Sequence, residues 1–469
     1  MTLESLTAIS PLDGRYRTRT GDLSDLVSEF GLIRLRVEVM IQWFIHLANE
    51  PSIENATKLD PATEDQCRDI WRQFNIDDAR TVQAIEVEIN HDVKAVEYFV
   101  KNKLQDLGLE ECIEFVHFAC TSEDVNNLAY GLLLRRSRQT CLLPAIEGVL
   151  QAIAILAREY AEIPMLSRTH GQPASPTTVG KELANFVARM EVCLDDLENC
   201  PIYGKMNGAV GNYNAHFIAY PHVNWTSLSE DFVSSLGLTF NPMTTQIEPH
   251  DYMAKLFQEL QALNQVLLDF NRDVWGYISI GYFKQHLIEN EVGSSTMPHK
   301  VNPIDFENAE GQIGLAGALL NHLAAKLTVS RWQRDLSDST ALRSVGTAFA
   351  HCMVAYSSTL RGIHKLELDN DVITKDLEVS WEVLTEAIQT TMRKHGIKEP
   401  YERLKQWTRG RHFDESVYRD ILSQLELPAE AMKELEALTP ATYIGLASSL
   451  AHQTASRVIS RKSSKPDAD

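Results

Sequence analysis

The groups best suited to chemistry are concentrated in residues 293–303, which read Gly-Ser-Ser-Thr-Met-Pro-His-Lys-Val-Asn-Pro. Two serine hydroxyls, an imidazole, an ammonium and an amide lie close together there, and such groups can transfer protons and stabilise negative charge. The glycine and the two prolines oppose a helix or strand, so we predict an ordered loop between two apolar helical segments. Loops on a rigid scaffold often carry catalytic groups. The alternative is a linker that happens to be rich in serine and proline.

Three polar islands nearer the N-terminus allow a purely structural interpretation. Arg15 and Tyr16 lie in a turn-rich opening, and residues 90–92 (Asn-His-Asp) fit a hydrogen-bonded helix end. Residues 121–124 (Thr-Ser-Glu-Asp) fit a helix N-cap followed by acidic first-turn residues. From the residues alone, the structural interpretation is favoured for all three islands.

Two later islands carry more polar groups than a connector needs. In residues 167–176, a glycine and two prolines predict an irregular segment just before a helix that begins near Thr178. His170 lies in this segment, outside any periodic helix, so a catalytic and a structural role are equally open. Residues 330–343 hold three arginines among four hydroxyls. They form either a solvated face or a fork-shaped clamp for phosphate or carboxylate.

Long helices must position these islands. Apolar residues recur every three or four positions over residues 142–160, 253–278 and 306–327, and residues 22–47 follow the same spacing. The three later stripes predict helices that are bundled together, and the apolar residues beside the stripes favour association between chains. No alternating strand pattern competes, so we predict an all-α fold. The glycine-rich run at residues 204–211 follows no predicted strand and matches neither a dinucleotide fingerprint nor a P-loop.

The length of the chain suggests about three domains. We expect an N-terminal helical domain at residues 1–112, a central helix bundle carrying the serine-rich loop at residues 113–365, and a smaller C-terminal helical domain at residues 366–469. The helices of the central bundle would hold the loop, and the other domains would flank it.

The composition restricts the class of protein. The 469 residues carry a formal net charge of −20, which argues against a general nucleic-acid surface and requires locally concentrated positive charge to bind any phosphorylated substrate. Seven dispersed cysteines without CxxC pairs indicate a reducing compartment and no zinc or disulfide framework. The first residues lack the layout of a signal peptide, and no uninterrupted run of 18 apolar residues suggests a membrane span. We therefore expect a cytoplasmic protein without membrane or nucleic-acid partners.

Residues 293–303 fill every fixed position of the pattern GSSxMPxKxNP, and so resemble the signature of the fumarase/aspartase superfamily. His299, before the lysine, is similar to the adenylosuccinate lyase branch. Fumarases and aspartases usually carry a small residue there, and argininosuccinate lyases a glutamine. Each of the five islands also resembles a segment of that branch, in the right order and over nearly the whole chain.

The resemblance implies cleavage of adenylosuccinate to AMP and fumarate, and of succinylo-aminoimidazole carboxamide ribotide (SAICAR) to its carboxamide (AICAR) and fumarate. Both are steps of purine biosynthesis, and neither needs a metal or organic cofactor. It further implies a homotetramer whose central helices form a shared bundle and whose sites draw on three subunits. Ser294 would be the general base, His170 the general acid, and His91 a histidine that contacts the phosphate and orients the substrate. The implied substrate contacts are Arg15, Tyr16, Asn90, His91, Asp92, Thr121, Ser122, Gln246, Ser295, Lys300, Val301, Asn302, Asn308, Arg334, Ser339, Thr340, Ala341, Leu342 and Arg343.

These roles suit a β-elimination. The proton next to a carboxylate is weakly acidic, so preorganised donors such as Lys300 and Asn302 would have to stabilise the carbanion. A serine hydroxyl is ordinarily a poor base, and a nearby ammonium with converging backbone N–H groups would favour the alkoxide of Ser294. His170 can hold the proton that the leaving nitrogen needs, a contribution of roughly 10²–10⁴-fold. The sequence leaves open whether His91 or His170 delivers that proton.

Two alternatives stay open from the sequence. Another lyase of the superfamily, such as argininosuccinate lyase, would need no phosphate clamp. A non-catalytic helical scaffold would be expected to lose Ser294 or His170, and both residues are present.

Overall fold

The structure is a computed structural model that describes residues 4–464, except residues 55, 57, 287–296, 298, 299 and 411. Helices dominate the described residues, and the strands found there form three two-stranded sheets. The all-α prediction is therefore confirmed. The chain divides into two compact units: unit 1 contains Met1–Ala145, Cys193–Asn264 and Gly311–Ser357, and unit 2 contains Ile146–Val192, Gln265–Glu310 and Ser358–Asp469. The expected division into three domains stays a prediction.

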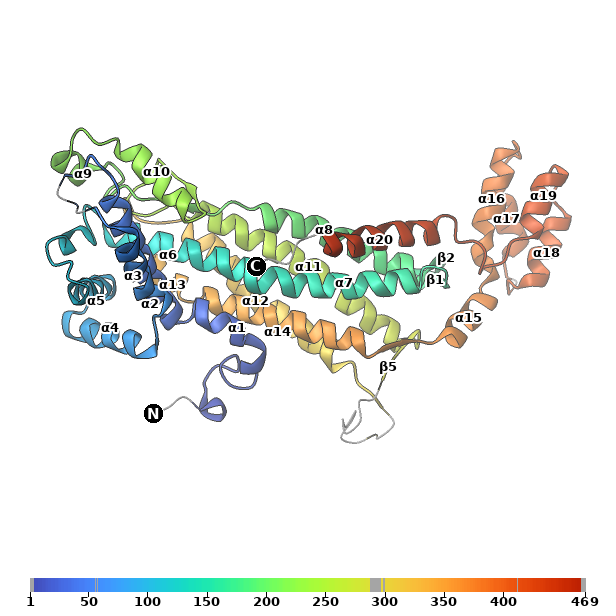
Figure 1. Cartoon of the computed structure of the whole chain (residues 1–469). Coiled ribbons are helices and arrows are strands. Elements are labelled where there is room, and N and C mark those ends of the chain that lie inside the picture. Colours follow the sequence, from blue (N-terminus) through green and yellow to red (C-terminus); the bar gives the residue numbers. More distant parts are fainter. Residues whose placement is uncertain are drawn as a thin grey trace. The chain divides into compact units, whose positions relative to one another are not determined.

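Five long helices, which Figure 1 labels, each contribute residues to both units. They are α7 (Leu143–Glu159), α8 (Val179–Asn199), α11 (Asp251–Ser279), α12 (Ile304–Leu327) and α14 (Val345–His364). The three apolar stripes of the sequence coincide with α7, α11 and α12, so these predicted helices are confirmed.

Unit 1 adds a group of shorter elements to its share of the long helices. They are η1 (Ser5–Thr7), α1 (Arg17–Val27), α2 (Glu29–Ala48), α3 (Pro61–Arg72), α4 (Ile76–Ile89), α5 (Asp92–Asp106), η2 (Ile113–Phe115), α6 (Ser122–Ser137), η3 (Arg138–Leu142), β3 (Tyr203–Gly204), α9 (Asn214–Ala219), α10 (Trp225–Ser235), β4 (Thr239–Phe240) and α13 (Ser337–Leu342). Strands β3 and β4 pair in parallel.

The prediction of a single helix over residues 22–47 is wrong in one respect, because Ser28 interrupts the helix between α1 and α2. Ser28 adopts an extended backbone, and its side chain accepts a hydrogen bond from the N–H of Gly31, which caps the N-terminus of α2. Helix α2 is then buried on most of its surface and packs against α6. The carboxylate of Glu38 on α2 accepts hydrogen bonds from both Nη atoms of Arg136 on α6, at 2.6 and 2.7 Å.

Helix α6 continues through the π-helical turn η3 into α7. The whole stretch Ser122–Glu159 is long and apolar enough to cross a membrane by length and composition. Half of its most apolar window is buried within the protein, and a buried core helix passes the same test. This stretch is therefore weak evidence for a membrane span.

Unit 2 contains two antiparallel two-stranded sheets, of which β1–β2 is a hairpin and β5–β6 joins distant segments, and the C-terminal helices. Its elements are β1 (Pro164–Thr169), β2 (Gln172–Thr178), β5 (Phe283–Gln285), β6 (Leu366–Leu368), α15 (Asn370–Glu378), η4 (Trp381–Leu384), α16 (Thr385–Lys394), α17 (Pro400–Thr408), α18 (Glu415–Ser423), α19 (Ala429–Glu436) and α20 (Ala447–Ser464).

Aromatic and polar contacts hold the long helices together inside unit 2. The ring of Phe270 on α11 meets Phe186 on α8 edge to face at 5.5 Å and Phe306 on α12 at 6.4 Å. Helix α20 joins this bundle, because Gln151 on α7 donates to the carbonyl of Val458 at 2.9 Å. Helix α20 also contacts strand β2.

Candidate active site

Three of the predicted islands meet in unit 1 through one chain of polar contacts. Arg36 on α2 donates from Nη2 to Asp92 Oδ2 at 2.9 Å and from Nε to Asn126 Oδ1 at 2.8 Å. Asn126 donates from Nδ2 to Glu123 Oε1 at 2.8 Å, and the same oxygen pairs with Arg334 Nη2 at 2.9 Å. This network therefore joins residues 90–92, residues 121–124 and residues 330–343.

Arg343 extends the network on the side of Asp92. Its Nη2 lies 3.5 Å from Asp92 Oδ2, its Nε lies 3.7 Å from Glu29 Oε2, and its Nη1 donates to Ser339 Oγ at 3.3 Å. The side chain is still 42% exposed, so an anionic ligand can reach the guanidinium. By contrast, Arg331 is exposed and pairs with Asp335 at 3.7 Å. The arginine-rich island thus combines a solvated member with two members held against carboxylates.

The charge on Asp92 is maintained by its neighbours. Burial raises the pKa of the Asp92 carboxyl, but the positive charge of Arg36, the N–H of Val93 and the more distant Arg343 outweigh burial and hold the pKa below its usual value. Asp92 is therefore an anion that orients two arginines.

Asn90 and His91 form the junction between α4 and α5. Asn90 has a φ of 53°, the left-handed conformation that asparagine tolerates at a helix C-terminus, and it ends α4. His91 is the N-cap of α5, where its Nδ1 accepts the N–H of Lys94 at 3.2 Å. The helix-end interpretation of this island is confirmed, and it leaves Nε2 of the half-exposed ring for a ligand.

Residues 121–124 form the expected N-cap of α6. The N–H of Thr121 donates to Asp124 Oδ2 at 2.7 Å, and the carboxylate also accepts the N–H groups of Asn207 (3.0 Å) and Gly208 (3.2 Å). Lys205 Nζ lies 3.0 Å from Asp124 Oδ1, and both side chains are fully buried. The glycine-rich run at residues 204–211 therefore surrounds the buried carboxylate of Asp124, and these contacts fix Thr121 and Ser122 at the start of α6.

Two further predicted residues lie in loops of unit 1. Gln246 donates to the carbonyl of Ala209 at 3.2 Å, which ties its loop to the glycine-rich run. Arg15 and Tyr16 lie directly before α1, and the N–H of Tyr16 donates to the carbonyl of Pro11 at 2.8 Å. Thr340, Ala341 and Leu342 lie on α13 together with Ser339.

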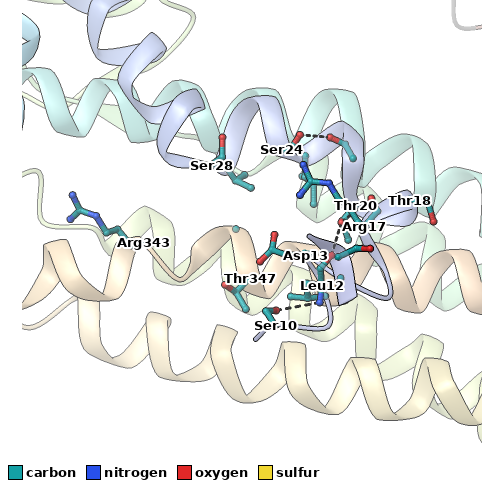
Figure 2. Close-up of a pocket in the computed structure, with 17 residues that line it drawn as sticks. Ser10, Leu12, Asp13, Arg17, Thr18, Thr20, Ser24, Ser28, Arg343 and Thr347 are labelled. Atoms are coloured by element: carbon teal, nitrogen blue, oxygen red, sulfur yellow. Dashed lines mark hydrogen bonds between the residues drawn. The ribbon is translucent and has the colours of Figure 1, made fainter. Parts of the chain in front are cut away.

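A pocket of about 660 Å³ opens beside Arg343 in unit 1. The N-terminal turn, α1 and the first turn of α14 line it, and Figure 2 shows Arg343 at one side, apart from Asp13, Arg17 and Thr20. The lining combines the side chains of Arg17 and Arg343 with several hydroxyls and the carboxylate of Asp13.

In unit 2, His170 occupies the tip of a β-hairpin. Strand β1 pairs with β2 so that Thr169 faces Gln172, which leaves His170 and Gly171 as a two-residue turn. Both have positive φ values, 53° and 74°, as a type I′ turn requires. The irregular segment expected here is therefore wrong. The imidazole is exposed in the single chain.

The remaining predicted residues lie near the serine-rich loop. Ser294 and Ser295 are outside the described residues. Lys300 is exposed, and its N–H donates to the carbonyl of Met297 at 3.0 Å, while the carbonyl of Asn302 accepts the N–H of Ile304 at the start of α12. Asn308 lies on α12 and accepts a hydrogen bond from Ser358 Oγ at 2.8 Å. Val301 is half-buried.

Sequence reasoning missed the residues that hold the islands together, namely Arg36, Asn126 and Lys205. A signal existed for Arg36, because three charged residues, Arg34, Arg36 and Glu38, interrupt the apolar stretch Leu-Ile-Arg-Leu-Arg-Val-Glu-Val of α2. A charge at a buried helical position normally has a partner. Asn126 and Lys205 carried no comparable signal.

Comparisons with known proteins agree on the family. Residues 14–316 match the family described as Lyase, and residues 330–444 match the family described as Adenylosuccinate lyase C-terminal. The protein named adenylosuccinate lyase in Vibrio cholerae is 53% identical over 95% of this chain and 98% of its own length. The Escherichia coli protein of the same name is 51% identical over the same shares of the two chains.

Two solved structures support the fold at low sequence identity. The 3-carboxy-cis,cis-muconate lactonizing enzyme from Pseudomonas putida aligns with a TM-score of 0.71 at 20% identity, covering 95% of this chain and 98% of that one. The fumarate lyase from Mesorhizobium sp. BNC1 aligns with a TM-score of 0.73 at 18% identity, covering 93% and 97%. The family matches and the two relatives about half identical to this chain show that the chain belongs to the adenylosuccinate lyase family, a family of lyases.

Proposed function

We propose that this chain catalyses the β-elimination of fumarate from adenylosuccinate, giving AMP, and from SAICAR, giving AICAR. The observation that carries the proposal is the identity of about half over nearly the full length of relatives named adenylosuccinate lyase. The polar network of unit 1 supports it, because Arg334 and Arg343 are held there by carboxylates beside His91 and Ser122. In a chain with a net charge of −20, these arginines supply local positive charge for an anionic substrate.

In the proposed mechanism, Ser294 removes the proton next to the carboxylate, and Lys300 and Asn302 stabilise the charge that develops on it. His170 delivers a proton to the leaving nitrogen. Its place at an exposed, tightly turned hairpin tip supports this role, because the imidazole is accessible while the strands limit its movement. His91 contacts the phosphate of the substrate.

The other substrate contacts proposed from the family signature are spread over both units. In unit 1 they are Arg15, Tyr16, Asn90, Asp92, Thr121, Ser122, Gln246, Arg334 and residues 339–343, and in unit 2 they are Ser295, Lys300, Val301, Asn302 and Asn308. No metal or organic cofactor takes part in the proposed reaction. Proton transfer and charge stabilisation by side chains suffice for an elimination of this type.

We further propose a homotetramer whose active sites each combine residues of three subunits. Large apolar residues on the long helices support this assembly, because Ile155 on α7, Trp275 on α11 and Leu315 on α12 are each about half exposed in the single chain, and Val192 on α8 is still more exposed. Exposed apolar faces on long helices are typical of surfaces that bury against another chain. Cytoplasmic localisation is supported by the cysteines: no disulfide joins any of the seven, all of which lie within the described residues.

A fumarate-release assay tests the proposed reaction. Purified protein is incubated with adenylosuccinate, SAICAR or argininosuccinate, and the expected result is turnover of the first two only. The variants His170→Ala and His91→Ala should both lose activity, with the larger loss of kcat in the variant that lacks the proton donor. Release of fumarate from argininosuccinate alone would contradict the proposal.

Subunit mixing tests the shared active sites. Ser294→Ala and His170→Ala are each expected to keep only a small residual activity, because each lacks one end of the proton transfer. After denaturation and joint refolding, hybrid tetramers should contain some sites with both intact residues and recover part of the activity. Mass spectrometry should verify that hybrids form, and verified hybrids without activity would show that the two residues serve the same site from one subunit.

A further inference from the structure

A single carboxylate fastens the His170 hairpin to α15. Asp376 on α15 accepts a hydrogen bond from Arg168 Nη2 at 2.6 Å, and the same oxygen, Oδ2, accepts the hydroxyl of Tyr282 at 2.8 Å. Arg168 lies on β1, two residues before His170, and its guanidinium also lies over the ring of Tyr282, 5.9 Å from the centroid. One oxygen atom therefore joins three segments of unit 2.

Tyr282 is a fixed partner in this contact. Its ring is 1% exposed and stacks on Tyr277 with centroids 6.0 Å apart and an interplanar angle of 6°. Its carbonyl accepts the N–H of Asp369, at the N-terminus of α15, at 2.9 Å. The phenol is buried, which with its contact to Asp376 raises the pKa of Tyr282 to about 12 and keeps the hydroxyl a donor at neutral pH. Both ends of α15 are thereby fastened to Tyr282.

The other anchors of the hairpin lie further from its tip. At its base, the N–H groups of Val179 and Gly180 donate to the carbonyls of Ile163 and Tyr160, each at 2.9 Å. The strand register shifts between Leu166 and Ser167, so Ser175 is an extra residue on β2, and its hydroxyl donates to Glu386. Of these anchors, the bond from Arg168 to Asp376 is the closest to His170 in sequence, so it has the most direct control over the position of the tip.

We propose that Asp376 is a positioning residue for His170, which it holds in place through Arg168. The inference rests on the proposed role of His170 as general acid. Asp376 need not touch the substrate, so its loss should displace the proton donor while leaving substrate binding largely intact. A displacement of about 1 Å in a catalytic group can cost about 10²-fold in rate. We therefore expect the effect on kcat and little effect on KM.

The experiment compares Asp376→Asn, Asp376→Glu and Tyr282→Phe with a matched control in fumarate-release assays of the full-length enzyme. The control is Glu415→Gln, because Glu415 pairs with Arg419 at 3.2 Å on α18 of the same unit, outside the long helices that are proposed to form the tetramer. Asp376→Asn should lower kcat about 10- to 100-fold with KM changed less than about 3-fold. Asp376→Glu should recover part of kcat, Tyr282→Phe should lose less than Asp376→Asn, and the control should match wild type.

A double-mutant comparison shows whether Asp376 acts through His170. In a His170→Ala background, Asp376→Asn should cause almost no further loss of kcat, because the residue that it positions is already absent. The inference would be overturned if Asp376→Asn lowered kcat by the same factor in the wild-type and His170→Ala backgrounds. It would also be overturned if Asp376→Asn left kcat unchanged while His170→Ala lowered it. An inactive wild type, or full activity in His170→Ala, would instead overturn the proposed function and this inference with it. If Asp376→Asn does not fold, Tyr282→Phe and Asp376→Glu carry the same comparison.

Discussion

Replacing Arg36 by methionine should disconnect the polar network of unit 1. Arg36 is 1% exposed, and its guanidinium is the only link in that network between Asp92 and Asn126. Methionine keeps a flexible aliphatic side chain in the core but removes the charge and every donor. Asp92 then loses its nearer cation, and the carbonyl oxygen of Asn126 loses its donor.

The size of the effect follows from the burial of both partners. Removing one member of a buried ion pair costs roughly 3–5 kcal/mol, because the other charge is left uncompensated. Asp92 keeps 26% of its side chain exposed and retains Arg343 at 3.5 Å, which favours the lower end of that range. We expect Arg36→Met to lower the free energy of unfolding by about 3 kcal/mol at pH 7.

The same variant should change the pH dependence of stability. In the wild type the pKa of Asp92 is depressed, so its contribution is present above the unfolded pKa of about 3.9 and is lost as pH falls through the folded value. Without Arg36, the pKa of Asp92 rises and this contribution disappears. The deficit of Arg36→Met relative to wild type should therefore be largest at neutral pH and shrink below about pH 4.

Urea unfolding at a fixed subunit concentration measures both effects. The matched control is Arg80→Met, which breaks the exposed pair of Arg80 with Asp77 at 2.7 Å and should change stability by less than about 0.5 kcal/mol. Arg36→Lys keeps the charge but not the two-pronged donor, so it should be intermediate. A neutral-pH deficit below about 1 kcal/mol for Arg36→Met, or one that does not shrink in acid, would refute the reasoning.

Two further predictions concern buried titratable side chains of unit 1. Burial lowers the pKa of His216 to about 4, so the wild-type free energy of unfolding should fall by about 3 kcal/mol as pH drops from about 6.5 to about 4. His216→Phe keeps the edge-to-face contact with Trp225 and should flatten this pH dependence in urea unfolding. An unchanged pH dependence in the variant would contradict the prediction. Lys205→Met should lower the free energy of unfolding by about 3 kcal/mol in the same assay, because it leaves the buried charge of Asp124 without its cation. Adding Asp124→Asn should recover part of this loss. A loss under about 1 kcal/mol would show that the backbone N–H groups alone stabilise the carboxylate.

Periodicity located the long helices because it is a local property. The stripes at residues 142–160, 253–278 and 306–327 became α7, α11 and α12, with ends within a few residues of those expected. The break at Ser28 was missed because the apolar spacing runs on through it, although a serine before a glutamate is a common N-terminal signal.

The hairpin of β1 and β2 was missed for a different reason. Pro173 and Pro176 argued against a strand, yet both lie in β2. In a two-stranded sheet each strand has one unpaired edge, and proline is tolerated there because no ladder hydrogen bond is lost on that side. The left-handed pair His170 and Gly171 then closes the turn.

The sequence by itself determined the helical class, the family and the kinds of side chain available for chemistry, because periodicity and motifs depend on near neighbours in the chain. Only the tertiary structure decided which side chains meet. Arg36 contacts a carboxylate 56 residues away and an amide 90 residues away, and Asp376 contacts an arginine more than 200 residues before it. Such partnerships depend on how the helices pack, because a buried charge needs a partner but does not specify where in the sequence that partner lies.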